Sequence, residues 1–551
     1  MKRAFWYEEE TIDNEFIAAE EERYKKEKLY NAMKQYQNCS ITENGALGYR
    51  TTMHSLLDLN FMVSSLRNRD ERFIVREFIK AYYDSPKYAV KWLFFLRDIL
   101  EGMGERRTFR ICIKYLAQSH TEVAAAVMKL IPEYGRYDDL LVFLDTKLCK
   151  ETCLFLKAQL EKDLLAMEKK EPISLLAKWL PSSNTSSKAT RKQAQILVRK
   201  FGMTEKDYRK TLSALRAYGN VVEVKMSASK WDEIEYEKVP AKANLKYEKA
   251  FTKHDETRRN EYLLKVFMGD AKLNKKGIMP YEVVHRFLEG KCFSRALKDD
   301  FLAELMWKQI TEQGFENQWG LEDCIVVADG SGSMYTKVSG STSVTAMEVC
   351  NSLAIYFAEQ LKGIFHNKAI TFSSRPQFIE LDKGKNLKEK LEIMLAHDEV
   401  ANTNIEAVFD MLLDIAVCNH ILAEELPKQV LIISDMEFDQ ASQPMKWPWG
   451  TSRKDENWKK FTPALFDTIE KRYQQAGYQM PRLIFWNVCG RTDTIPKVEN
   501  EQGICLLSGF SQNAMKIAAD RKKKDPYESL LQVLDGSRYD AVEEAIKELV
   551  A

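Results

Sequence analysis

The segment Ile325–Met334 most strongly constrains the fold of this chain, because an apolar run in it ends in an acid and is followed by two serines. Its first half, Ile325–Ala328, lacks polar alternation, as expected for a parallel strand covered on both faces. Asp329 ends the run of apolar residues, and two serines follow at alternate positions. Because ligands of open α/β sheets bind at the carboxyl ends of such strands, we expect a binding site here.

The residues after this predicted strand favour a hard cation. Gly330 and Gly332 allow a sharp turn, while Asp329, Ser331 and Ser333 can direct oxygens toward one point. Mg²⁺ is the expected ion, with Mn²⁺ or Ca²⁺ as alternatives.

Two later segments supply the remaining predicted ligands. Thr403 precedes an amphipathic stretch over 406–417, so its hydroxyl is expected at the start of a helix. A second buried-type strand, within 429–436, also ends in an acid, Asp435. The predicted metal site therefore comprises Asp329, Ser331, Ser333, Thr403 and Asp435.

This spacing of Asp-x-Ser-x-Ser, Thr and Asp resembles the metal-ion-dependent adhesion site of von Willebrand factor A domains, over roughly residues 319–520. The resemblance implies metal contacts from the hydroxyls of Ser331, Ser333 and Thr403. It also implies that Asp329 and Asp435 act on the metal mainly through bound waters or hydrogen bonds. In that family a carboxylate of a protein partner often fills the vacant coordination position. A weakly charged, oxygen-only shell would leave the cation electrophilic enough to accept such an acid.

The surrounding pattern predicts a doubly wound α/β domain over 319–551. A helix is expected at 345–362, and one strand or two at 368–381, broken at Pro376. Strands at 482–488 and 503–507 alternate with helical patterns at 463–475 and 512–519.

The sequence argues against an enzyme. A serine hydrolase of the α/β type needs a histidine after its acid in the chain. The candidate acid is Asp435, and no histidine follows His420. An aspartyl phosphotransferase would want a second acid where Ser331 stands. Phosphate-loop and His-Glu-x-x-His zinc motifs are also absent.

Composition indicates a globular protein of two to four domains. The chain has 551 residues, 45% hydrophobic and 30% charged, and its net charge of +1 requires any polyanion site to be a local patch. It has no apolar run of 18 residues that could span a membrane, and its first 28 residues are too rich in charge for a signal peptide. Its ten cysteines form no C-x-x-C pair, which fits a reducing compartment. We therefore expect a cytoplasmic protein.

The first 318 residues show helical periodicity almost throughout, which favours a helical-repeat-like layout although no clean repeat period is present. A polar stretch at 181–187 suggests a division into helical regions 1–181 and 182–318.

Two positive stretches lie in the second region. The first predicts a nucleic-acid-binding face made by Lys188, Arg191, Lys192, Arg199, Lys200, Arg209 and Lys210. The second runs over 242–259 and is interleaved with Tyr247, Phe251 and Tyr262. The alternative for both stretches is a solvated helix face whose aromatics belong to the core.

Several N-terminal segments resemble the uncharacterised DUF2828 family: 42–46, 56–59, 91–98, 102–110, 178–181, 208–210 and 231–234. That family pairs a helical region with an A-type metal domain, an arrangement similar to the Ro/TROVE ring proteins, which bind ends of misfolded RNA and small structured RNAs. Within 102–110, the arginines could form an anion site with Arg97, or pair with buried Asp58 or Asp98.

Two classes of function follow. The first is a non-enzymatic RNA-binding or ribonucleoprotein scaffold whose A-type domain binds an acidic side chain of a partner through a divalent metal. The second is a protein-only adaptor that uses the same metal without nucleic acid.

Overall fold

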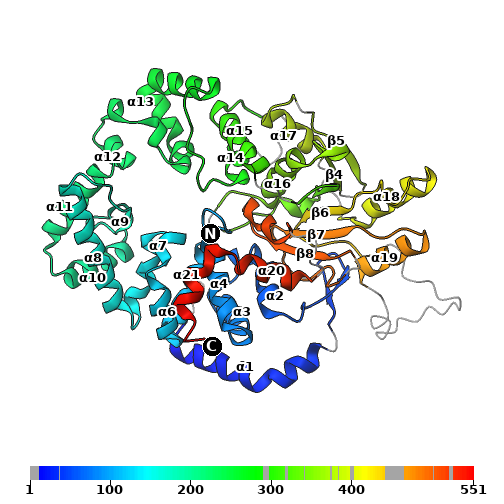
Figure 1. Cartoon of the computed structure of the whole chain (residues 1–551), viewed down its shortest axis with the longest axis horizontal. Coiled ribbons are helices and arrows are strands. Elements are labelled where there is room, and N and C mark those ends of the chain that lie inside the picture. Colours follow the sequence, from blue (N-terminus) through cyan, green and yellow to red (C-terminus); the bar gives the residue numbers. More distant parts are fainter. Residues whose placement is uncertain are drawn as a thin grey trace, which may run out of the picture. The chain divides into compact units, whose positions relative to one another are not determined.

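The computed structural model describes residues 12–35, 38–288, 297–316, 320–340, 342–372, 375–382, 384–397, 403–440, 464–499, 502–519 and 525–550. They form two compact units, whose elements are drawn in Figure 1. The helical unit comprises 1–24, 71–277 and 534–551, and the sheet unit comprises 25–70 and 278–533. The regions expected from the sequence (1–181, 182–318 and 319–551) follow chain order, whereas these two units interleave along the chain.

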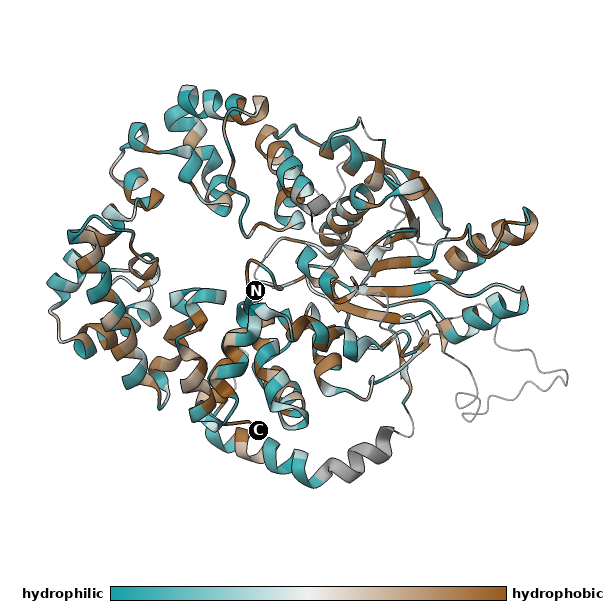
Figure 2. Cartoon of the chain, in the orientation of Figure 1, coloured by the Kyte–Doolittle hydropathy of each residue, from teal (hydrophilic) through white to brown (hydrophobic). Residues whose placement is uncertain are grey.

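The sheet unit is built on six strands in the order β5-β4-β3-β6-β7-β8. Within this sheet, only β5 is antiparallel to its neighbour, β4. The segment expected to be one strand or two therefore forms two strands, β4 and β5, on either side of Pro376. Every residue of β3, β6, β7 and β8 is buried, and these strands are largely brown in Figure 2. The strands are β3 Cys324–Asp329, β4 Lys368–Phe372, β5 Gln377–Glu380, β6 Gln429–Ser434, β7 Arg482–Asn487 and β8 Ile504–Ser508.

Helices cover both faces of this sheet, as two adjacent residues of β7 show. Trp486 lies 5.4 Å from Phe357 of α16, and Phe485 lies 4.9 Å from Phe466 of α19, measured between ring centroids. Because successive side chains of a strand point to opposite faces, α16 and α19 lie on opposite sides. The helices are α2 Ser55–Phe61, α14 Pro280–Leu288, α15 Phe301–Glu316, α16 Ala346–Gln360, α17 Leu387–Ala396, α18 Glu406–Cys418, α19 Leu465–Gln475 and α20 Pro526–Leu534. The stretch expected to be helical at 512–519 is a 3₁₀ helix, Gln512–Ile517.

Residues 38–70 belong to the sheet unit because hydrogen bonds attach them to loops that follow its strands. Their hairpin, β1 Ser40–Ile41 and β2 Leu47–Gly48, leads to Tyr49, which pairs with Ile495 through two backbone hydrogen bonds. Further along, the Ser64 amide donates to the Ser508 hydroxyl over 2.9 Å.

The helical unit contains a core of large aromatic side chains. Phe78 of α3 contacts Trp92 of α4 and Tyr115 of α5, and all three rings are buried. Its helices are α3 Glu71–Asp84, α4 Pro86–Arg97, α5 Arg107–Ser119, α6 Thr121–Met128, α7 Ile131–Tyr134, α8 Cys149–Glu168, α9 Leu176–Trp179, α10 Lys188–Phe201, α11 Glu205–Tyr218, α12 Val222–Ser227, α13 Ala241–Met268 and α21 Asp540–Ile546. Helix α1, Asn14–Gln35, begins in this unit.

Ion pairs account for Arg97, Arg110 and the buried Asp98. The Asp139 carboxylate accepts hydrogen bonds from Arg97 Nε at 2.8 Å and from Arg110 Nε at 2.6 Å. Arg538 Nε donates to Asp98 at 2.8 Å. Arg97 and Arg110 thus pair with Asp139 and not with Asp58 or Asp98, and the arginine on Asp98 comes from the far end of the chain.

We predict that Asp139→Ala destabilises the helical unit by about 3–5 kcal/mol, because it leaves the buried Arg97 guanidinium without a counter-charge. Asp145→Ala is the matched control, since its carboxylate is 63% exposed and pairs with Lys114. That change should cost about 0–1 kcal/mol. Urea denaturation measures both, and equal losses would contradict the assignment.

Candidate metal site and basic surface

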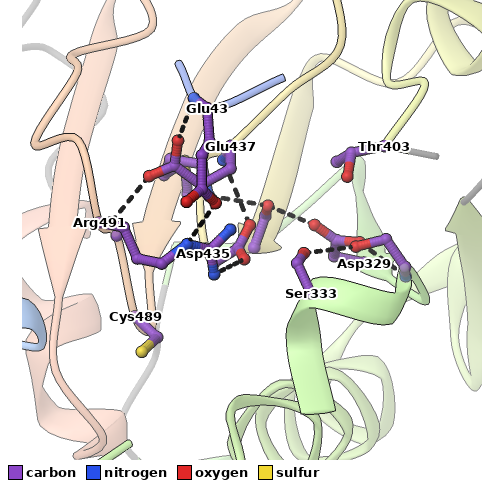
Figure 3. A network of polar contacts seen from close by, with 12 residues as sticks. Glu43, Asp329, Ser333, Thr403, Asp435, Glu437, Cys489 and Arg491 are labelled. Atoms are coloured by element: carbon purple, nitrogen blue, oxygen red, sulfur yellow. Dashed lines mark hydrogen bonds and ion pairs between the residues drawn. The ribbon is translucent and has the colours of Figure 1, made fainter. Parts of the chain in front are cut away.

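Asp329 and Asp435 lie at the carboxyl ends of neighbouring parallel strands, β3 and β6. With strands numbered along the chain, the sheet order is 3-2-1-4-5-6, so the chain reverses direction across the sheet between these two strands. Doubly wound sheets bind ligands at this switch point. Figure 3 shows Asp329, Ser333 and Asp435 gathered at this edge.

The Asp329 carboxylate is 1% exposed and organises the turn that follows it. One oxygen accepts from the Ser331 amide at 2.9 Å, and the other accepts from the Ser434 hydroxyl at 2.5 Å. Ser331 Oγ and Ser333 Oγ lie 3.0 Å apart. The predicted turn therefore places both serine hydroxyls beside one another.

Asp435 is fully buried and is the second acid of the site. It accepts from the Glu437 amide at 3.2 Å and from Arg491 Nη1 at 3.0 Å, and Ser333 also hydrogen-bonds to it. Burial raises the pKa of Asp435 and Arg491 opposes that rise. Burial, and then the Asp435 charge, also raise the pKa of Asp329.

Thr403 reaches this edge from the segment before α18. It lies three residues ahead of the helix, and its carbonyl accepts from the Asp439 amide at 2.9 Å. The Thr403 hydroxyl accepts from Asn44 Nδ2 at 3.3 Å and is buried. Residues 401 and 402, which precede Thr403, lie outside the described residues. The structure thus gathers all five predicted side chains at one edge of the sheet.

The chemistry of these donors fits a hard divalent cation. Two buried carboxylates and three hydroxyls supply oxygen ligands, and the side-chain nitrogens of Arg491 and Asn44 donate to Asp435 and Thr403. Among the described residues, no group of three or more His, Cys, Asp or Glu side chains could hold a metal ion. Metal binding here would therefore depend on Ser331, Ser333 and Thr403 as well as on the acids.

Sequence reasoning missed the residues that surround this cluster. Glu437 is buried and accepts from the backbone amides of Glu43, Arg491 and Thr492 at 2.7–2.8 Å. Asn44 Nδ2 donates to the Glu437 carbonyl at 2.6 Å as well as to Thr403. Two features of the sequence could have pointed to these residues: the 42–46 segment, which was noted only for its family resemblance, and the acid two residues after Asp435.

The predicted nucleic-acid-binding face lies on α10 and α11 of the helical unit. Leu197 and Phe201 of α10, with Tyr208 and Leu212 of α11, are buried. The seven predicted basic side chains are all exposed, and within the described residues none has an ion pair. They are Lys188, Arg191, Lys192, Arg199, Lys200, Arg209 and Lys210. We call these seven residues the basic surface.

Two arginines of the second positive stretch are structural. Arg259 of α13 is buried, pairs with Glu248, and lies 5.0–5.6 Å from the ring centroids of Tyr236, Phe251 and Tyr262. Arg258 pairs with Asp255. The core interpretation therefore holds for Phe251 and Tyr262.

In the part of the chain that the structure describes, no helix is long and apolar enough to cross a membrane.

Parts of this chain match two family models, and the chain is similar to known proteins that include a viral protein and a solved structure. Residues 185–321 match the domain of unknown function DUF2828, and residues 323–548 match the domain of unknown function DUF7788. The uncharacterized protein L728 of Acanthamoeba polyphaga mimivirus is 28% identical over 534 residues, covering 90% of this chain and 87% of that protein. The crystal structure of the Deinococcus radiodurans RO (RSR) protein aligns with a TM-score of 0.39 and 14% identity, over 83% of this chain and 93% of that one.

We predict that Mg²⁺ raises the melting temperature of the protein, and that Asp329→Ala and Ser331→Ala each abolish this rise. Binding to the folded state alone adds about 2.7 kcal/mol when the free ion is at 100 times its Kd. Ser343→Ala, in the same connection between β3 and α16, is the control and should keep the rise. An equal rise in all four proteins would exclude this site.

Proposed function

We propose that the protein is a non-enzymatic RNA-binding or ribonucleoprotein scaffold, and that its sheet unit binds a protein partner through a divalent metal. The basic surface carries the RNA part of this proposal. Exposed basic side chains without acidic partners are free to neutralise phosphates, and the resulting counterion release drives binding.

The strand-end cluster supports the metal part. We infer a metal site of the von Willebrand factor A type, in which the hydroxyls of Ser331, Ser333 and Thr403 would contact the ion. Asp329 and Asp435 would act through waters or hydrogen bonds. The ion would supply one electrophilic position for an outside carboxylate. Mg²⁺ is the expected ion, with Mn²⁺ or Ca²⁺ as alternatives.

The second candidate is a protein-only adaptor with the same metal site and no nucleic acid. The structural role of Arg258 and Arg259 favours it, because part of the positive charge of α13 is already neutralised within the protein. The two candidates differ in whether the basic surface binds RNA.

We predict that changing Arg191, Lys192, Arg199 and Lys200 to Gln weakens binding of a structured RNA. The slope of log K against log salt should fall by roughly 3–4, since up to four fewer phosphates are neutralised. Electrophoretic shift assays across a salt series measure both quantities.

The control for this RNA experiment changes Lys129, Lys147, Lys162 and Lys169 to Gln, which removes the same charge from exposed positions of the helical unit outside both positive stretches. Its affinity should stay closer to that of the wild type. Unchanged affinity and slope in the first variant would favour the protein-only adaptor.

We predict that a partner captured from host lysate in Mg²⁺ is released by EDTA and recovered when Mg²⁺ is restored. Thr403→Ala should lose it, because the change removes a hydroxyl expected on the ion. Circular dichroism checks that this variant stays folded. A partner retained equally in EDTA and in Thr403→Ala would leave any bound ion with a structural role only.

A further inference from the structure

Arg491 is fixed beside the predicted metal site through its backbone. It lies in the loop after β7, and its amide donates to Glu437 Oε1 over 2.7 Å. Glu437 is also held by the amides of Thr492 and Glu43, each at 2.8 Å. The backbones of Arg491 and Glu43 are therefore tied to one buried carboxylate, and their positions do not depend on their side-chain contacts.

The Arg491 guanidinium bridges two carboxylates of very different exposure. Nη1 lies 3.0 Å from Asp435, which is fully buried, and Nε lies 2.6 Å from Glu43 Oε2. The Glu43 side chain is 58% exposed and Arg491 is 28% exposed. Figure 3 shows Arg491 between these two acids. The pair with exposed Glu43 is weak because water screens it, whereas separating Arg491 from buried Asp435 would leave an uncompensated charge.

We propose that Arg491 is the second recognition contact for the carboxylate that binds at the metal, and that Glu43 is its resident competitor. This inference rests on the proposed metal-dependent binding of an acidic partner. An incoming carboxylate has two oxygens, so one can reach the ion while the other takes the guanidinium edge that Glu43 occupies. Only the Glu43 side chain has to move, because its amide stays on Glu437.

This arrangement makes Arg491 a specificity-determining residue. Asp435 holds the guanidinium at the edge of the cluster, and the Glu43 pair keeps it neutralised until an acid arrives. A neutral ligand brings no negative charge to the guanidinium and cannot replace Glu43, whereas a carboxylate can give one oxygen to the ion and the other to Arg491. The ligand class is therefore an acidic peptide segment, presented by a protein partner.

The experiment measures metal and acid binding separately on the full chain. Mn²⁺ binding is followed by electron paramagnetic resonance. Acid binding is followed by fluorescence anisotropy of a rhodamine-labelled tetraglutamate peptide, with tetraglutamine as the neutral probe. The variants are Glu43→Gln, Arg491→Gln and Arg491→Lys. Glu380→Gln is the matched control, because its side chain is 63% exposed and pairs with Lys368.

Glu43→Gln should tighten tetraglutamate binding about two- to fivefold, the range expected for loss of one exposed competing pair. It should not tighten Mn²⁺ binding, because it removes a negative charge near the ion. Arg491→Gln should weaken the peptide and keep Mn²⁺ binding, and Arg491→Lys should weaken the peptide less. A purely structural role for Arg491 would move both affinities in the same direction.

Suppose that Mn²⁺ binds, but that the peptide affinity is the same in wild type, Glu43→Gln and Glu380→Gln. That result would overturn this inference and leave the metal site intact. Absence of Mn²⁺ binding in the wild type would instead overturn the proposed function on which it rests. If Arg491→Gln fails to fold, Glu43→Gln and Arg491→Lys still decide the outcome, since Glu43 is exposed and lysine retains the charge that Asp435 needs.

Discussion

Two carboxylates buried at the ends of adjacent parallel strands set the constraint that shapes the sheet unit. Asp329 and Asp435 leave water almost completely, and an unpaired buried charge is costly enough to require compensation. The Ser331 amide and the Ser434 hydroxyl compensate Asp329, while the Glu437 amide and Arg491 compensate Asp435. Arg491 is shared with Glu43, so the acids at this edge outnumber the cations that contact them. A bound cation would relieve this imbalance.

The same constraint explains why residues 38–70 belong to the sheet unit. Glu437 adds a third buried acid, and its carboxylate accepts an amide from Glu43 as well as two amides from the loop after β7. Thr42 Oγ1 donates to the Phe438 carbonyl at 2.6 Å, and Asn44 reaches Thr403. Burying Glu437 thus recruits a segment almost 400 residues away in the chain. The N-terminal hairpin is one wall of the candidate site.

Features governed by local patterns could be predicted from the sequence. The continuous apolar runs of β3, β6 and β7 indicated buried parallel strands, and the acids at the ends of the first two indicated where the site would lie. The charged faces of α10 and α11 indicated exposed basic side chains. Each of these patterns depends on neighbours within one element, so the residues themselves reveal it.

Contacts between distant parts of the chain could not be predicted in the same way. Nothing in the 42–46 segment shows that its amide would meet Glu437, and Asp98 gives no sign that its arginine is Arg538. The aromatic residues of α13 suited nucleic-acid stacking as well as a core, and only the burial of Phe251 and Arg259 distinguishes the two. Hydrogen-bond partners that fold together from opposite ends of the chain leave no periodic signal.

Diffraction from crystals soaked in MnCl₂ tests the central claim most directly, because the anomalous signal of manganese locates the ion without relying on stability or activity. The account predicts one strong anomalous peak beyond the carboxyl ends of β3 and β6, bounded by Ser331, Ser333 and Thr403. Complete data without a peak at that edge, or with manganese only at other positions, would contradict it.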